Sequence, residues 1–166
     1  MARTPDPSEA EFVRRVREPR ATTVEPGRQR ARRSAMMVLY RSDLVGGDLE
    51  AAITGFEGEH GFELPPYGAT IVRGVAARIE ELDAELEERL EGWTLDRLGS
   101  VERSVLRAGL WELVAESVPG PVAIDEAVEL AKRYATPEAA KLVNGVLAAW
   151  LRDHQGRDVD ARDEEE

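Results

Sequence analysis

The stretch SVERSVLRAGLWELV, residues 100–114, carries a long apolar pattern that predicts a helix. Its apolar residues recur at steps of three and four, the period of an α-helix with one face in a core; they are Val101, Val105, Leu106, Leu110, Trp111, Leu113 and Val114. Ser100 is predicted as the N-cap, with an incomplete capping box because Arg103 rather than Glu follows three residues later. Pro119-Gly120-Pro121 is expected to end the helix.

Two helices are predicted on the N-terminal side of this stretch. The first spans residues 28–44, with an arginine-rich start, an apolar end and Gly46-Gly47 as its stop signal. The second runs from Leu49 to about Glu57.

A longer helix is predicted from Pro65-Pro66 to Gly92, since proline in the first turn loses no needed N–H. One continuous apolar stripe supports it, made of Val72, Val75, Ile79, Leu82, Leu86 and Leu90.

Two more helices are predicted near the C-terminus. Residues 123–135 are amphipathic, with Asp125 and Glu126 placed in the first turn, where the helix dipole favours acids. Pro137 is expected to open the last helix. No segment alternates with period two for long enough to make a strand, so the predicted class is all-α, with six or seven helices.

Charge is distributed unevenly along the 166 residues, whose net charge is −11. Residues 1–33 hold nine arginines and five acids, which leaves 13 basic and 28 acidic side chains in the remainder. Residues 1–27 contain four prolines and few large apolar residues, and are interpreted as a flexible arm. Residues 153–166 hold seven acids and are predicted to be a disordered tail, which leaves residues 28–152 as the folded domain.

Several classes of function are disfavoured by residues that the chain lacks. It has no cysteine and only two histidines, His60 and His154, which we interpret as surface residues. No glycine-rich phosphate loop is present, and most acids fall on predicted polar faces. We therefore expect no catalysis, no metal and no cofactor. No apolar run approaches the length of a membrane span and the N-terminus is not a secretory signal, so we expect a cytoplasmic protein without a membrane partner.

The best candidate binding site is the run RQRARR, residues 28–33. Arginine binds phosphate through a planar fork and stacks on unpaired bases, so Arg28, Arg30, Arg32 and Arg33 are candidate RNA contacts. An alternative is that they only balance the acidic remainder of the chain. Tyr40 lies two turns beyond Arg33 and could equally be a core ring with its hydroxyl at the rim.

Four segments together resemble the NusB family of bacterial transcription antitermination factors. They are residues 28–32 followed by Leu39-Tyr40, residues 98–107 (LGSVERSVLR), residues 121–132 (PVAIDEAVELAK) and residues 141–147 (KLVNGVL). The resemblance covers about residues 28–151 in order. It implies two packed helical bundles and a role without catalysis: binding boxA RNA of ribosomal RNA operons together with NusE, the tenth small-subunit ribosomal protein, in the RNA polymerase antitermination complex.

The resemblance also assigns residues to the two partners. It places Arg28, Gln29, Arg30, Arg32, Arg33, Lys141 and Leu142 on the RNA side. It places Tyr40, Asp96 and Glu102 on the side that faces NusE. Gln29 stands where some members have a further arginine, and Leu142 replaces an aromatic residue. Where the two bundles meet, we expect a buried cluster made of Val105, Leu106, Leu110, Val143 and Leu147.

Two other interpretations remain open from the sequence. The chain could be a homodimeric helical scaffold whose arginine-rich face is buried against its own copy. It could also be a detached RNA-binding module of a ribosomal RNA methyltransferase, although no nucleotide-binding motif or nucleophilic cysteine accompanies it.

Overall fold

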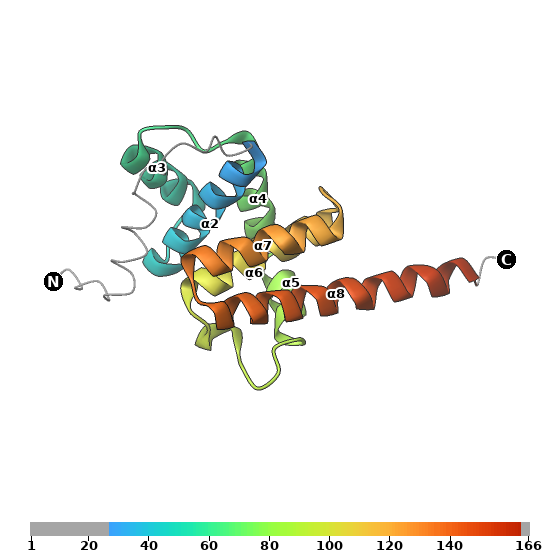
Figure 1. The fold of residues 1–166 in the computed structure, drawn as a ribbon. Helices are drawn as coiled ribbons and strands as arrows, with labels where there is room; N and C mark the ends of the chain where they lie inside the picture. Colours follow the sequence, from blue (N-terminus) through green and yellow to red (C-terminus); the bar gives the residue numbers. More distant parts are fainter. Residues whose placement is uncertain (1–26, 164–166) are drawn as a thin grey trace.

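Residues 27–163 are described by the structure, a computed structural model, and within this range every regular element is a helix and there is no strand (Figure 1). The elements in chain order are α2 (Gly27–Val45), α3 (Leu49–His60), α4 (Pro66–Ala77), α5 (Ile79–Glu87), the short 3-10 helix η1 (Leu95–Arg97), α6 (Ser100–Ala115), α7 (Gly120–Tyr134) and α8 (Pro137–Asp163). The predicted all-α class with six or seven α-helices is confirmed for this part of the chain.

Helix α6 is the centre of the fold. Helices α2, α3 and α4 pack together on one side of it, and α7 and α8 pack on the other, while α5 also lies against α6. Gly109 of α6 allows the close approach of α8, since a Cβ atom at this position would lie only 2.8 Å from Leu147 Cδ1. Gly74 of α4 likewise leaves room for the indole of Trp111. The expected two bundles therefore meet along α6.

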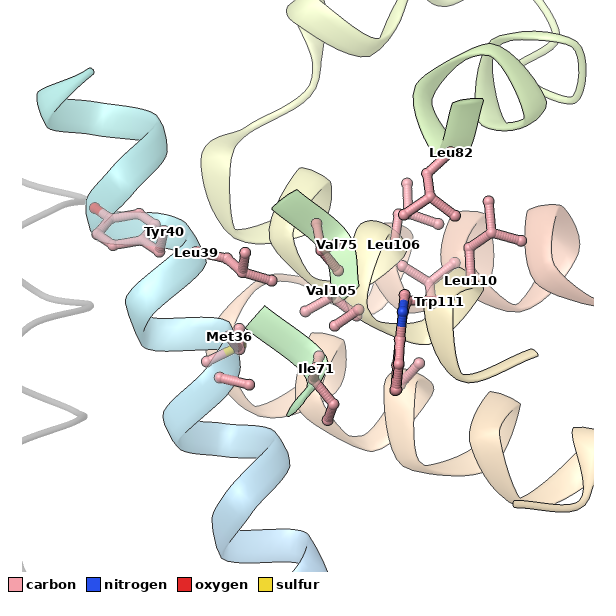
Figure 2. Close-up of a cluster of buried hydrophobic side chains, with 14 of the residues drawn as sticks. Met36, Leu39, Tyr40, Ile71, Val75, Leu82, Val105, Leu106, Leu110 and Trp111 are labelled. Atoms are coloured by element: carbon pink, nitrogen blue, oxygen red, sulfur yellow. The ribbon is translucent and has the colours of Figure 1, made fainter. Parts of the chain in front are cut away.

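The buried cluster at this junction is the one that the apolar periodicity predicts. Val105, Leu106, Leu110, Val143 and Leu147 are each at most 1% exposed. Figure 2 shows Val105, Leu106 and Leu110 of α6 facing side chains from α2, α4 and α5.

The predicted long helix from Pro66 to Gly92 is wrong, because the chain turns at Arg78. Its backbone, at φ −127° and ψ 21°, leaves the helical region and separates α4 from α5. The break turns Ile79 outward to 37% exposure, although it belongs to the apolar stripe. A straight helix would carry its stripe past the end of the α6 contact, whereas the turn lets both halves pack against α6.

Two helix starts differ from the prediction. The N-cap of α6 is Gly99 rather than Ser100, which is already helical. Helix α7 begins at Gly120, with Pro119 as its N-cap, so Asp125 and Glu126 lie in its second turn. The Pro119-Gly120-Pro121 run thus starts α7, in keeping with the preference of proline for first turns. The predicted end of the previous helix at this run is wrong, because α6 already ends at Ala115, with Glu116 as a left-handed C-cap at φ 52°.

The acidic segment from residue 153 is helical as far as Asp163, where a disordered tail was predicted. Extending an existing helix costs little, and the first residues past 152 are held in place: Asp153 pairs with Arg89 at 3.0 Å and His154 stacks on Trp150 at 3.7 Å. Of the arm predicted over residues 1–27, only Gly27 belongs to the described residues, and it begins α2. Residues 164–166 of the predicted tail also lie outside the described residues. No helix in the described range is long and apolar enough to cross a membrane.

We predict that Leu106→Ala lowers the free energy of unfolding by about 2–5 kcal/mol, the usual cost of a cavity at a fully buried leucine. Urea denaturation followed by circular dichroism measures the change. Leu44→Ala is the matched control, because Leu44 is 41% exposed and its truncation should cost less than about 0.5 kcal/mol. Equal effects of the two variants would contradict the placement of α6 at the centre of the core.

Candidate nucleic-acid interface

The side chains of the RQRARR run point in three directions from the first two turns of α2. Arg28 and Arg32 face Tyr67, with their guanidinium carbons 4.5 Å and 5.7 Å from the centre of its ring. Arg30 lies over the ring of Phe62, at 4.6 Å. Gln29 donates to Glu126 of α7 at 3.3 Å. The run is therefore a ridge with cations on several sides, and not a flat basic patch.

Arg32, a candidate RNA contact in the sequence, is buried in the structure. It is 5% exposed, and its guanidinium donates to both carboxylate oxygens of Glu112 at 2.8 Å and 3.0 Å. Burial alone would lower the pKa of Arg32, but the hydrogen bond and charge of Glu112 raise it above the ordinary value. Arg32 is therefore a structural cation that joins α2 to α6.

Tyr67 completes this buried group. Its hydroxyl donates to Glu112 Oε2 at 2.7 Å and lies 3.0 Å from Ser117 Oγ. Burial raises the pKa of the Tyr67 hydroxyl, and the bond to Glu112 adds to the increase, so the proton stays on the tyrosine. One sequence signal pointed to this arrangement: Glu112 is an acid between the apolar residues Trp111 and Leu113, and burial of this stretch requires a cation to pair with it.

Arg33 is half-buried and, together with Arg32, lines a hollow between α2 and α7. The hollow is also lined by Gln29, Glu126 and Glu129, and by two cations of α7 that the sequence pattern did not single out, Lys132 and Arg133. Lys132 pairs loosely with Glu129, at 3.5 Å. The signal for these cations is their place in the last turn of α7, where basic residues meet the helix dipole.

Lys141 and Leu142 lie near the start of α8, apart from the arginine cluster. Helix α8 packs on α7 and α6, and Figure 1 shows α7 lying between it and the start of α2 in that view. Lys141 is exposed, whereas Leu142 is half-buried and packs against the core. At the start of α8, Lys141 is therefore accessible to a ligand, whereas Leu142 serves mainly in packing.

A second charged group fixes the other end of α2 and the loop before α6. Asp43 accepts from Arg103 at 2.7 Å and from Arg107 at 3.4 Å, and Arg107 also donates to both oxygens of Asp83 at 2.8 Å. Burial would raise the pKa of Asp43, but hydrogen bonds from Arg103 and Ser100 and the nearby arginine charges lower it. Arg103 also donates to the carbonyl oxygens of Leu95 and Leu98, which holds η1 in place.

The three residues assigned to the NusE side lie around this charged group but differ in exposure. Asp96 is exposed on η1, where a hydrogen bond from the Thr94 hydroxyl lowers its pKa. Glu102 is half-buried and its carboxylate accepts from the Gly99 N–H at 2.6 Å. With Gly99 as N-cap, Glu102 occupies the third helical position. Its bond to the Gly99 N–H is the one that the N3 acid of a capping box makes, so the prediction of an incomplete box with Ser100 as the cap is wrong on this point.

Tyr40 is 7% exposed on α2, one turn before Asp43. Figure 2 shows its hydroxyl directed away from the cluster that Leu39 enters. This placement agrees with the alternative that the ring packs against the core and leaves only its polar end near the surface.

The two histidines are packed more closely than a surface interpretation predicts. His60 ends α3, where its ring stacks on Phe56 at 4.4 Å and its Nδ1 lies 2.9 Å from the Phe56 carbonyl oxygen. His154 stacks on Trp150 within α8. Among the described residues, no group of three histidine or acidic side chains is arranged to hold a metal ion.

Comparison with known proteins agrees with this architecture. Residues 29–152 match the NusB family. The chain is 46% identical to the transcription antitermination protein NusB of Saccharopolyspora erythraea over 125 residues, 72% of this chain and 83% of the relative. It is 41% identical to the NusB protein of an Exiguobacterium species over 128 residues, 76% of this chain and 98% of that relative.

Solved structures are similar over the same part of the chain. A chain from a crystal structure of the antitermination factors NusB and NusE in complex with double-stranded RNA matches with a TM-score of 0.70 and 35% identity, covering 76% of this chain and 97% of that one. The solution structure of NusB from Aquifex aeolicus matches with a TM-score of 0.69 and 35% identity, covering 80% of this chain and 93% of that one.

We predict that Glu112→Gln lowers the free energy of unfolding by about 3–5 kcal/mol, because it leaves the buried charge of Arg32 without a counter-ion. Chemical denaturation measures this. The control is Glu129→Gln. The Glu129 side chain is 71% exposed, so removal of its charge should leave the free energy of unfolding almost unchanged. A stability change no larger than that of the control would show that the pair is not formed in solution.

A second prediction concerns acid. Folding lowers the pKa of Asp43, so its ionised carboxylate stabilises the fold at every pH above its ordinary pKa of 3.8. This contribution is lost as the pH falls through the lower pKa of the folded state. The stability difference between the wild type and Asp43→Asn should therefore be constant near neutral pH and shrink below about pH 3.8. Urea titrations at a series of pH values test this, and a difference that does not vary with pH would contradict it.

Proposed function

The chain belongs to the NusB family, and we propose that it is a transcription antitermination factor that binds boxA RNA of ribosomal RNA operons together with NusE. In this role it helps RNA polymerase to read through terminators, as a binding protein without catalytic chemistry. A factor that acts on nascent RNA works where the polymerase works, so we place it in the cytoplasm. The observation that carries the proposal is the start of α2, which presents exposed arginines from an otherwise acidic chain of a family that has been crystallised with NusE and RNA.

We propose an RNA surface made of Arg28, Gln29, Arg30 and Arg33, with Lys141 and Leu142 as a second contact on α8. Arg28 and Arg30 are exposed and can reach phosphate oxygens with a planar fork. Lys132 and Arg133 extend this surface along the hollow between α2 and α7. Arg32 contributes by fixing the helix that carries the surface, through its bond to Glu112.

We propose that NusE binds at the other end of α2, over Asp96, Glu102 and the hydroxyl of Tyr40. A ribosomal protein is expected to be basic, and the exposed carboxylate of Asp96 and the half-buried carboxylate of Glu102 complement such a partner. Support comes from Arg103, which holds η1 and Asp43 together and so keeps the two carboxylates on one rigid surface. The acidic surface also disfavours unspecific binding to nucleic acid, which suits a factor that needs a partner protein.

The RNA surface is tested by Arg30→Ala. We expect weaker binding to boxA RNA in a gel shift. We also expect a weaker salt dependence, whose slope falls by about 0.7 for each phosphate of single-stranded RNA that the protein no longer neutralises. Arg152→Ala is the matched control, because Arg152 is also exposed but lies about four turns beyond the start of α8. Unchanged affinity and slope in the folded Arg30→Ala protein would contradict the proposed surface.

The NusE surface is tested by comparing Glu102→Gln with Glu102→Ala. Glutamine keeps an oxygen that can accept from the Gly99 N–H, so its melting temperature should stay near that of the wild type, while alanine should cost about 0.5–2 kcal/mol, as the removal of other helix caps does. Both variants remove the charge, so both should weaken NusE binding in calorimetry, with RNA binding by the isolated protein unchanged. If glutamine retains full NusE affinity, Glu102 serves only as the cap of α6.

A further inference from the structure

Two aromatic rings lie beneath the two exposed arginines of the RNA surface. Phe62 follows the left-handed Gly61 that ends α3, and Tyr67 lies in the first turn of α4. Neither belongs to α2, and no comparison assigns either ring a role. The guanidinium carbons of Arg30 and Arg28 lie 4.6 Å and 4.5 Å from the respective ring centres, within the range of a cation–π contact.

Both rings are held firmly from behind. Phe62 meets the ring of Phe56 edge-to-face at 5.6 Å, with an angle of 87° between the planes, and Phe56 is only 2% exposed. His60 stacks on Phe56 and also meets Phe62, at 5.9 Å. Tyr67 is fixed by its hydroxyl, which donates to Glu112 within the buried ion pair. The faces that the two rings offer to the arginines therefore belong to the rigid part of the fold.

An arginine side chain has several rotatable bonds, and ordering it at a phosphate costs conformational entropy. Stacking on a fixed ring removes much of that freedom before RNA arrives. The ring occupies only the flat face of the guanidinium, so N–H groups at its edge can still donate to phosphate. In Arg28, Nη1 also donates to the Ser117 carbonyl oxygen at 3.3 Å, which further orients this side chain.

We propose that Phe62 and Tyr67 are positioning residues for RNA, which hold the guanidinium groups of Arg30 and Arg28 in place for binding to the phosphate backbone. The inference rests on the proposed function, since it concerns the same surface. Phe62 gives the cleaner test of the two, because the hydroxyl of Tyr67 also supports the buried ion pair.

The experiment measures boxA RNA affinity over a range of salt concentrations for Phe62→Leu, Phe62→Tyr, Arg30→Ala and the double variant Arg30→Ala/Phe62→Leu. Phe62→Leu keeps an apolar side chain but removes the aromatic face, so affinity should fall about two- to fivefold, as expected for an exposed cation–π contact. The slope of affinity against salt should not change, because the number of phosphates neutralised is the same. Phe62→Tyr keeps the face and should bind as the wild type does.

The double variant separates positioning from a general effect on folding. Once Arg30 is absent, Phe62→Leu should cause no further loss of affinity. An equal loss with and without Arg30 would overturn the proposal, and so would full affinity of Phe62→Leu when Arg30→Ala binds weakly. Failure of the proposed function gives a different result, in which Arg30→Ala itself binds boxA RNA as tightly as the wild type.

Discussion

The buried ion pair between Arg32 and Glu112 sets the position of α2, and the directions of the other arginines follow from it. Two charges removed from water are stable only when their geometry is good and their remaining hydrogen bonds are made. Glu112 meets this condition by accepting from Nε and Nη2 of Arg32 and from the Tyr67 hydroxyl. These bonds join α2, α6 and α4. Because each helical residue rotates by about 100°, fixing Arg32 toward the interior also fixes where its neighbours point.

The two ends of α2 are held by different groups of charges, with an apolar segment between them. Residues 35–39 are all buried in the core, so the helix cannot shift along its axis without breaking both sets of bonds. At its start the Arg32–Glu112 pair supports the proposed RNA surface, and at its end Asp43 is bound by Arg103 and Arg107 beside the proposed NusE surface. One rigid helix thus carries both surfaces and keeps the distance between them constant.

The sequence predicted the helices well because apolar periodicity and proline positions act locally. It failed where the answer depends on what the helix packs against. The stripe from Val72 to Leu90 is continuous in sequence, but only the position of α6 decides that the chain must turn at Arg78. In the same way, the RQRARR run indicates candidate RNA contacts without showing that Arg28 and Arg32 face Tyr67 or that Arg32 pairs with Glu112. Phe62 and Tyr67 carried no signal because single aromatic residues have no pattern.

Counting arginines in the RQRARR run overstates the charge that this segment offers to RNA. Arg32 is neutralised inside the protein, and Arg33 faces a hollow whose edge includes Glu126 and Glu129. Arg28 and Arg30 remain exposed on different sides of one helical turn, each backed by a ring. Such a narrow ridge, with carboxylates close to it, neutralises few phosphates and therefore gains little from counterion release. For the proposed RNA surface, this limits the affinity that the ridge can supply by itself and favours binding together with a partner protein.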